Sequence, residues 1–270
     1  MYTLYHHGSS VCAAKVRMAM HEKRLQWRGV YVDILKGEQF EESYLKLNPK
    51  GVVPTLVHSD RVVVESTVIC EYLDRLHPQT SLHPDNPYTY AKARYWTKAI
   101  DEDLHPNCAV LTFVASHRHT VAKLGKQKLE EFMNSTPPQS VTSGWKERKR
   151  QLIEQGFAAP DAGKGIRLYD LYLRKMNDAL AMNRWLLGPR FSIADVSLAP
   201  YVNRVAMMSM QGMWESGRLP HLERWWGQIQ ERPSFKPSLL DWVPPDLTAE
   251  LRMNGARSWP EVARIIDMTV

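Results

Sequence analysis

Cysteine is scarce in this 270-residue chain, and long apolar runs are missing. Its three cysteines, Cys12, Cys70 and Cys108, are too few for a disulfide framework, and their spacing matches no paired zinc-ligand pattern. No stretch reaches the roughly 18 apolar residues of a membrane-spanning helix. Met1–Gly8 lacks the basic and apolar regions of a secretory signal. We therefore expect a protein of the reducing cytoplasm, with no membrane partner and no bound metal.

The composition excludes intrinsic disorder, because 44% of the residues are hydrophobic and 24% are charged. The formal charge of +6 lies entirely beyond residue 85, since residues 1–85 hold equal numbers of basic and acidic side chains. A nucleic-acid or acidic partner would use such a charge. Six charges spread over so many residues favour solubility instead, so we expect no nucleic-acid partner.

Residues 1–76 alternate between short β-branched runs and helical patterns. They predict strands and helices in the order βαβ, helix, ββα, with a hairpin at Ser59-Asp60. The predicted strands cover 2–5, 27–34, 55–58 and 61–65, and the predicted helices cover 10–25, 41–47 and 66–76. This order favours a small mixed sheet with helices on its faces.

Strand signals nearly vanish after the proline-bearing linker 81–88. Helical patterns follow at 91–119, with a break or kink near Pro106, and at 166–186, 193–208 and 219–231. Residues 134–165 are rich in Gly, Pro and Ser and indicate a long insertion, and the chain ends in a tail with Pro and Trp. The sequence thus predicts an α/β domain over residues 1–80 and an all-α domain over 89–270.

Pro54 and the Glu65-Ser66 pair are the most informative features. Pro54 stands directly before a predicted strand. A trans bond there would make an ordinary strand start, whereas a cis bond would turn the preceding backbone toward an extended peptide. Ser66, as N-cap of the next helix, would form an anion site with the free N–H groups, and Glu65 would face an adjacent ammonium. Together they would recognise one end of an α-amino acid.

Ser9 and Ser10 stand where the first predicted helix begins. A hydroxyl there can donate to a thiolate held over the helix N-terminus. Lowering the pKa of a thiol from about 8.5 by ~2 units takes roughly 2.7 kcal/mol. One charge-assisted hydrogen bond and the helix dipole supply about that much. Cys12 has no second cysteine at redox spacing and is interpreted as a buried structural thiol, and His6 and His7 as solvent-facing loop residues without metal-like partners.

These motifs resemble the cytosolic glutathione transferases, in which a thioredoxin-like N-terminal domain precedes an all-α domain. The similarity is greatest to the serine-type, theta-like class and runs without gaps from position 10 through 48–49, 53–54 and 65–66. The resemblance implies that Ser10 holds the thiolate of glutathione. Ser9 is the second candidate, because a register slip of one residue would exchange the two.

The resemblance also assigns the residues that bind the rest of glutathione. Val53 would pair with the cysteinyl backbone, Pro54 would be cis, and Glu65 with Ser66 would bind the γ-glutamyl end.

Two departures concern the glycyl carboxylate and the partner subunit. Where the theta pattern has His and Lys around that carboxylate, this chain has Gln39 and Val52, so Lys50 would have to supply the cation. The family often takes an acidic residue from the partner subunit, and the acidic run 101–103, with Asp101 first, is the candidate.

The implied reaction is attack of the glutathione thiolate on a small apolar or aromatic electrophile, with glutathione as co-substrate in a homodimer. The run 67–73, the insertion 134–165 and the extended tail are similar to bacterial transferases that cleave β-aryl ethers. A theta-like dehalogenase and a non-catalytic interaction module of the same fold are further alternatives. A glutathione-affinity column separates the module from the enzymes.

The predicted all-α domain holds four further features. Ser192 and Asp195 form a capping box that we interpret as part of the fold. The basic cluster 145–150 is interpreted as a solvated helix face. The Met- and Trp-rich residues 207–214 indicate core or the rim of an electrophile pocket. Trp242 and Trp259 are candidates for a lid over that pocket.

Overall fold

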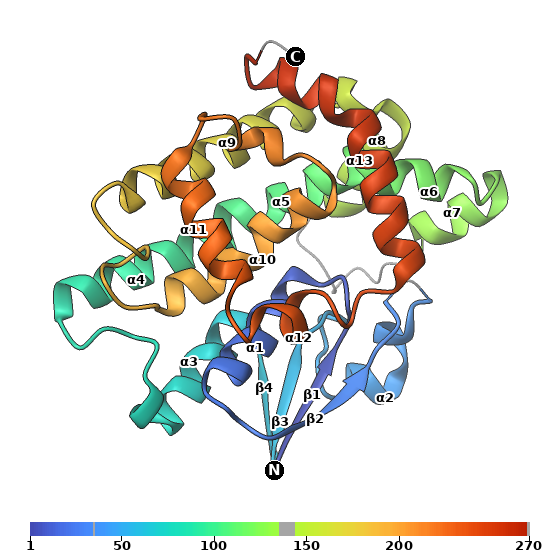
Figure 1. Ribbon diagram of the computed structural model, residues 1–270. Helices are drawn as coiled ribbons and strands as arrows, with labels where there is room; N and C mark the ends of the chain where they lie inside the picture. Colours follow the sequence, from blue (N-terminus) through green and yellow to red (C-terminus); the bar gives the residue numbers. More distant parts are fainter. Residues whose placement is uncertain (35, 135–143, 269–270) are drawn as a thin grey trace. The chain divides into compact units, whose positions relative to one another are not determined.

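A mixed four-stranded sheet forms the centre of the N-terminal part of the protein (Figure 1). The computed structural model describes residues 1–34, 36–134 and 144–268. The strand order is β2-β1-β3-β4, with β1 parallel to β2 and the other neighbours antiparallel. The strands are β1 (Tyr2–His6), β2 (Trp27–Tyr31), β3 (Thr55–His58) and β4 (Arg61–Val64). The expected mixed sheet and the Ser59-Asp60 hairpin are confirmed, although β2 is three residues shorter than predicted.

The chain divides by its internal contacts into two units, which are described separately. The first unit holds residues 1–98, 183–200 and 227–244, and the second holds 99–182, 201–226 and 245–270. The predicted domain limits at residues 80 and 89 and the insertion 134–165 stay predictions, and residues 135–143 of that insertion lie outside the described residues.

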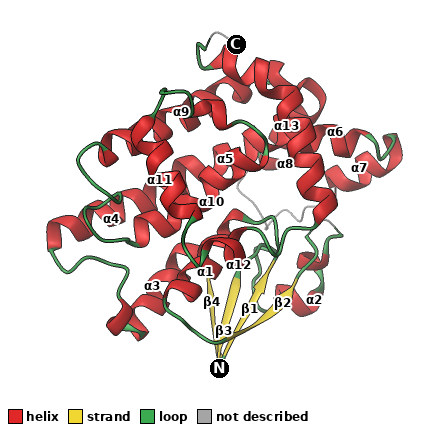
Figure 2. Ribbon diagram, viewed as in Figure 1, coloured by secondary structure: helices red, strands yellow, loops and turns green. Residues whose placement is uncertain are grey.

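Helices α1 and α3 pack against each other in the first unit, and α12 packs on α1 (Figure 2). Ser10 caps α1, whose buried face is largely Val, Ala and Met, and the helix ends at Glu22 before the left-handed Arg24. The helices of this unit are α1 (Val11–Glu22), η1 (Glu38–Phe40), α2 (Glu42–Leu45), α3 (Ser66–Leu76), η2 (Pro78–Thr80), α4 (Pro87–Ala99) and α12 (Phe235–Leu239).

Among its described residues, the second unit holds helices joined by turns and loops, and no strand. Helices α10 (Ile193–Met207) and α11 (Pro220–Gln230) begin in one unit and end in the other. The remaining elements are η3 (Ile100–Leu104), α5 (His105–Thr112), η4 (Phe113–His117), α6 (Arg118–Ala122), α7 (Lys126–Asn134), α8 (Trp145–Gln155), η5 (Gly156–Ala158), α9 (Pro160–Leu180), η6 (Gln211–Met213) and α13 (Pro245–Ile265).

The long helix predicted over 91–119 is present over residues 87–122 and contains two π-helical turns, η3 and η4. Pro106 lies two residues after the end of η3 and has no N–H for the carbonyl one turn earlier, so the helix widens there instead of breaking. The side-chain amide of Asn107 donates to the carbonyl of Asp103, 2.7 Å away. The structure therefore has a π turn in a continuous helix in place of the break or kink expected near Pro106.

Two helix limits were predicted wrongly. The helix expected over 166–186 spans Pro160–Leu180, because Pro160 occupies a favourable first-turn position and the chain turns after Leu180. Within the predicted insertion, residues 145–155 form helix α8. Two of its basic side chains are paired with acids: Arg148 with Asp161, and Arg150 with Glu130 and Glu154. Lys149 in the same cluster is buried, so the interpretation of residues 145–150 as a solvated helix face is wrong at Lys149.

The capping box at the start of α10 is confirmed. The carboxylate of Asp195 accepts hydrogen bonds from the backbone N–H of Ser192 at 3.0 Å and from its hydroxyl at 2.7 Å. The same carboxylate accepts the N–H of Leu186, so it ties the preceding loop to the helix. Met208, Met210, Met213 and Trp214 are fully buried, which makes most of the Met-rich run core.

Helix α13 docks on the second π turn of its unit. Ser258 and Asn254 donate to the carbonyls of Ala115 and Ser116 at 2.8 and 3.4 Å. A Cβ on Gly255 would lie 2.1 Å from the carbonyl oxygen of Met208, so only glycine permits this approach. The last part of the tail, residues 245–265, is therefore a helix packed within the second unit, whereas residues 232–244 belong to the first.

The two tryptophans predicted as a lid pack inside separate units. The Trp259 ring lies against Gly212 in the second unit, and the Trp242 ring meets His6 edge-on in the first, with the centroids 4.5 Å apart. Both rings are thus held by packing.

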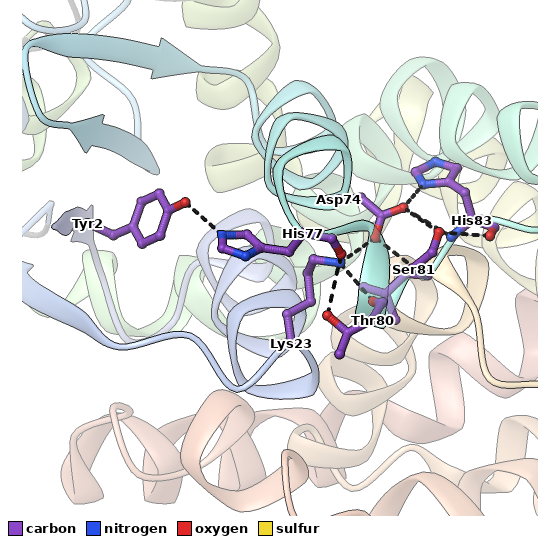
Figure 3. A network of polar contacts seen from close by, with 8 residues as sticks. Tyr2, Lys23, Asp74, His77, Thr80, Ser81 and His83 are labelled. Carbon is purple, nitrogen blue, oxygen red and sulfur yellow. Dashed lines mark hydrogen bonds and ion pairs between the residues drawn. The ribbon is translucent and has the colours of Figure 1, made fainter.

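A buried ion pair fastens the end of α3 to the chain that follows it (Figure 3). Lys23 on α1 donates to Asp74 on α3 at 2.6 Å and to the carbonyls of His77 and Thr80 at 2.9 and 2.8 Å. The Tyr2 hydroxyl lies 2.8 Å from Nε2 of His77 and links the network to β1.

None of the described helices is long and apolar enough to cross a membrane.

Candidate functional site

The strand register brings three predicted site segments to one end of the sheet. Tyr5 in β1 is opposite Thr55 in β3, and Thr55 is opposite Val64 in β4. The chain leaves β1 into the loop before α1, enters β3 from Pro54 and leaves β4 at Glu65. Because these three points lie at the same end of the sheet, segments 7–10, 53–54 and 65–66 are neighbours.

Ser10 caps the first helix with its own side chain. Its Oγ accepts the N–H of Ala13 at 3.2 Å, and its carbonyl accepts the N–H of Ala14 at 2.9 Å. The Ser10 hydroxyl makes no other hydrogen bond among the described residues, so its proton remains to be donated. Ser9 differs, because its hydroxyl lies 3.0 Å from Nδ1 of His7, which already accepts the Ser9 backbone N–H. That geometry makes the Ser9 hydroxyl the donor to His7.

His6 and His7 are buried, so the prediction that they face solvent is wrong. His6 belongs to β1 and packs against Trp27 and Trp242. Burial and the nearby Arg17 and His7 lower the pKa of His6 to about 3, so this imidazole is neutral. Periodicity could not have found this, because the segment that covers His6 comes more than 230 residues later in the chain.

The Val53–Pro54 peptide bond is cis, as the resemblance implies. Tyr44 and Asn48 hold the loop in front of it: the Tyr44 hydroxyl donates to the carbonyl of Val52 at 2.7 Å, and the Asn48 amide donates to the same oxygen at 2.9 Å. Among the described residues, no hydrogen bond engages the backbone N–H or C=O of Val53. The backbone of Val53 is therefore open to pair with a ligand.

Sequence reasoning missed Tyr44 and Asn48. Burial raises the pKa of Tyr44 to about 12, so its hydroxyl stays protonated and keeps donating. The Asn48-Pro49 pair belongs to the segments that carry the family resemblance, but no role was assigned to its amide. Both side chains also contact Thr55 Oγ1, at 2.9 and 3.3 Å, so they join the loop to β3.

Glu65 adopts a left-handed conformation with φ 66° at the turn into α3. Such a backbone costs a side-chain-bearing residue about 1–3 kcal/mol and is found most often at functional sites. The predicted role of Ser66 as N-cap is wrong by one residue: Glu65 holds the cap position, and Ser66 is the first helical residue. Ser66 is nearly buried, and its hydroxyl makes no hydrogen bond among the described residues.

Lys50 lies 2.6 Å from the carboxylate of Glu65. The two side chains are 61% and 52% exposed, so the pair contributes at most about 1 kcal/mol and opens readily. Lys50 thus lies beside Glu65, the residue predicted to bind the γ-glutamyl end of glutathione. Gln39 lies buried in η1, where its amide donates to the carbonyl of Ile34 at 3.3 Å and its Oε1 has no partner in the described chain.

Asp101 is the last of the predicted site residues, and the cysteines lie outside that set. Asp101 is exposed on η3 in the second unit. Cys12 is half-buried in the first turn of α1, less than predicted, while Cys70 and Cys108 are buried. The described residues bring no three His, Cys, Asp or Glu side chains together in a metal-binding group.

The sheet with its cis-proline loop, capped first helix and following helical chain defines a protein with a thioredoxin-like N-terminal part and an all-helical C-terminal part. Residues 9–76 match the glutathione S-transferase N-terminal domain, and residues 164–225 match the glutathione S-transferase C-terminal domain. Glutathione S-transferase Z1 of Arabidopsis thaliana is 31% identical over 174 residues, which are 63% of this chain and 73% of that protein. The chain belongs to the glutathione S-transferase family.

Two further relatives match over most of their length. Protein LigF of Sphingobium sp. strain SYK-6 is 28% identical over 86% of this chain and 91% of its own. The crystal structure of that protein, described as a β-etherase, superposes with a TM-score of 0.76 over 88% of this chain and 98% of its own, at 27% identity. The tetrachloro-p-hydroquinone reductive dehalogenase of Sphingobium chlorophenolicum is 29% identical over 87% of this chain and 94% of its own.

Proposed function

We propose that the protein is a glutathione transferase in which the Ser10 hydroxyl stabilises the glutathione thiolate during attack on an aromatic electrophile. The observation that carries this proposal is that three groups lie at the same end of the sheet. They are the Ser10 hydroxyl with a proton to donate, the unpaired backbone of Val53 and the unbonded hydroxyl of Ser66. An extended tripeptide would present a thiol, a central backbone and a carboxylate to these three points in turn.

Ser10 is favoured over Ser9 because its hydroxyl proton is not used in another hydrogen bond among the described residues. The Oγ of Ser10 accepts from Ala13, so its O–H remains for a thiolate, whereas the Ser9 hydroxyl donates to His7. The dipole of the 12-residue helix α1 adds to that stabilisation. The thiol proton passes to solvent, the sulfur forms a bond to the electrophilic carbon, and the leaving group departs with its electron pair.

The two ends of glutathione would bind on either side of that sulfur. Ser66 and the first N–H groups of α3 would hold the γ-glutamyl carboxylate, and Glu65 would face its ammonium. Lys50 would exchange Glu65 for a ligand carboxylate, since the exposed Lys50–Glu65 pair is weak. Gln39 would complete the glycyl end.

The test is a matched pair of substitutions, Ser10→Ala and Ser9→Ala. With glutathione and a chromogenic chloro-dinitro aromatic, we expect Ser10→Ala to lower kcat/KM at least tenfold, about 1.4 kcal/mol of transition-state stabilisation. Ser9→Ala should lower it less than threefold. Loss of the N-cap hydroxyl costs about 1 kcal/mol of stability in Ser10→Ala, so thermal unfolding should confirm that the variant is folded at the assay temperature. An unchanged rate in Ser10→Ala, or a larger loss in Ser9→Ala, contradicts the assignment.

Cleavage of β-aryl ethers is the second candidate, favoured by the similarity to the LigF β-etherase along nearly the full length of both chains. The thiolate would form a C–S bond, and the aryl oxide would leave with the C–O electrons and take a proton from water. Release of the phenol from a chromogenic β-aryl ether in the presence of glutathione supports it. Halide release from a chlorinated hydroquinone would instead favour a dehalogenase like the relative from Sphingobium chlorophenolicum.

We further propose that the protein is a homodimer. Apolar side chains are exposed on three elements of the first unit, β4, α3 and α4; they are Val62, Val68, Leu76, Tyr88 and Tyr95, which are 42–69% exposed. Asp101 would then be available to the partner's glutathione site. Sedimentation equilibrium measures the mass, and Val68→Glu should shift the mass toward that of one chain.

If the protein is not retained on immobilised glutathione, the non-catalytic interaction module becomes the better interpretation.

A further inference from the structure

Arg17 on α1 is a fully buried arginine that contacts no carboxylate among the described residues. Its Nε donates to the carbonyl of Ser238 at 2.8 Å, and its Nη1 lies 3.2 Å from Nδ1 of His6. The other two N–H contacts go to the carbonyls of His7 and Gly8, at 3.1 and 3.2 Å. Buried arginines are ordinarily paired with an acid, because an uncompensated charge is costly to remove from water.

The guanidinium lies at the level of the helix start, although Arg17 is two turns along α1. Side chains in a helix point back toward its N-terminus, and this one reaches the carbonyl of Gly8. Gly8 is two residues before Ser10, so the guanidinium is within roughly 10 Å of the Ser10 hydroxyl. Arg17 therefore holds in place the loop that delivers Ser9 and Ser10.

The residues around Arg17 leave its charge unbalanced. Burial lowers its pKa to about 9, which still leaves it charged at neutral pH. His6 from β1 is neutral, and burial together with Arg17 lowers the pKa of His21 on the same helix. Tyr31 from β2 has a pKa raised by burial and remains protonated. Helix α12 offers only the carbonyl of Ser238.

The remaining charged groups in the neighbourhood face other partners. Lys15, two residues away on α1, points to Thr67 on α3, with its Nζ 2.8 Å from Oγ1. Asp33 pairs with Lys36, and Glu38 accepts the N–H of Asp33. The cation at Arg17 therefore lacks an anion of its own, and the nearest place where an anion would bind is the start of α1.

We propose that Arg17 is a positioning residue that holds the Ser9-Ser10 loop through the carbonyls of His7 and Gly8 and stabilises the bound thiolate with its uncompensated positive charge. This inference rests on the proposed glutathione transferase function. The α12 segment is part of the same device, because it supplies the Ser238 carbonyl. A Cβ on Gly8 would also lie 1.8 Å from the carbonyl oxygen of Trp242, so loop and segment are in close contact.

The first test compares Arg17→Gln with Arg17→Lys and Arg232→Gln. The ultraviolet absorbance of bound glutathione thiolate is titrated with pH, and the pH profile of kcat/KM is measured. Arg17→Gln keeps donors but removes the charge, so the midpoint should rise by about one pH unit, a roughly tenfold loss at pH values below both midpoints. Arg17→Lys should keep most of the wild-type midpoint.

Arg232→Gln is the matched control. It removes one positive charge in the same unit, but Arg232 pairs with Glu22 at the far end of α1, at 2.5 and 2.8 Å. The length of α1 separates that charge from Ser10 by about 16 Å. Its midpoint should equal that of the wild type. A merely structural role of Arg17 would lower stability and activity without moving the midpoint.

A second pair of variants tests the charge even if Arg17→Gln does not fold. His6→Asn keeps a neutral acceptor where Nδ1 of His6 meets Arg17, and His6→Asp places a carboxylate there. His6→Asp should raise the midpoint as Arg17→Gln does, because the added carboxylate cancels the charge. His6→Asn should leave it unchanged.

The outcomes separate the two proposals. If the wild type shows a bound thiolate and neither Arg17→Gln nor His6→Asp moves the midpoint, the role of Arg17 is overturned and the transferase function stands. If the wild type binds no glutathione thiolate at all, both proposals fail.

Discussion

Asp74 is the residue whose replacement should most affect the stability of the first unit. Its carboxylate accepts five hydrogen bonds: from Lys23 at 2.6 Å, from the N–H of Leu82 at 2.8 Å, from the N–H and Nδ1 of His83 at 3.2 and 2.7 Å, and from the Ser81 hydroxyl at 3.2 Å. Figure 3 shows Lys23 and His83 directed at it from two different segments. Both members of the Lys23–Asp74 pair are at least 95% buried.

Asp74→Asn would leave the Lys23 ammonium buried without its anion and turn an amide NH₂ toward hydrogen-bond donors. Removing one partner of a buried pair costs about 3–5 kcal/mol. Lys23 keeps the carbonyls of His77 and Thr80, so we expect the lower end, about 3 kcal/mol. At about 2–4 °C per kcal/mol for a chain of this size, the midpoint of thermal unfolding should fall by roughly 6–12 °C.

The pH dependence gives an independent check. Burial alone would raise the pKa of Asp74, but hydrogen bonds from His83, Lys23 and the Leu82 N–H hold it well below its ordinary range. A depressed folded-state pKa adds stability that is complete above the unfolded value of about 3.9 and is lost as the pH falls through the folded value. The gap between wild type and Asp74→Asn should therefore be constant from about pH 7 to 5 and narrow below about pH 4.

Urea unfolding followed by tryptophan fluorescence measures this gap. Glu261→Gln is the control, because Glu261 pairs with Arg264 on an exposed face of α13 and its loss should cost less than about 0.5 kcal/mol. If the free energy of unfolding of Asp74→Asn is within about 1 kcal/mol of the wild-type value at neutral pH, the buried Lys23–Asp74 pair does not stabilise the first unit as we expect.

Two further predictions concern helices α8, α11 and α13. Gly255→Val should lower the free energy of unfolding by at least about 2 kcal/mol, because its Cβ would meet backbone atoms of Met208. Gly227→Ala in α11 has open space around the new Cβ and should raise the free energy of unfolding by about 0.5–1 kcal/mol. Thermal unfolding of both variants measures the two effects. Lys149→Met should raise the free energy of unfolding at pH 7 by about 1–3 kcal/mol, because burial lowers the pKa of Lys149 to about 8 and so penalises its charged form. That gain should shrink as the pH rises from about 8 and vanish above about 10.5, and a gain that stays constant with pH would contradict it.

Local patterns predicted the features that depend on neighbouring residues. The Ser59-Asp60 hairpin and the Ser192–Asp195 capping box follow from the chemistry of a few adjacent residues. The position of Pro54 raised the question of a cis bond, and the resemblance to a family answered it.

Polar residues with distant partners escaped prediction. Nothing near Arg17 and Lys23 in the sequence indicates that Ser238 and Asp74 are their partners. His6 and His7 were assigned to solvent because two histidines in a loop carry no sign of the aromatic rings that cover them. The same reason explains why Tyr44 was missed, since its contacts with Val52 and Thr55 exist only after the loop has folded.

The sequence by itself determined the order of elements over residues 1–76, the sheet and hairpin of the first unit, the helical character of the second and the family to which the chain belongs. Apolar periodicity and turn chemistry are encoded over ten residues or fewer, so they survive in the bare chain. Only the tertiary structure decided which polar groups are buried and what they meet. Burying a charge is tolerable only with suitable partners, and the partners of Arg17 and Asp74 are brought to them by segments that the chain supplies elsewhere.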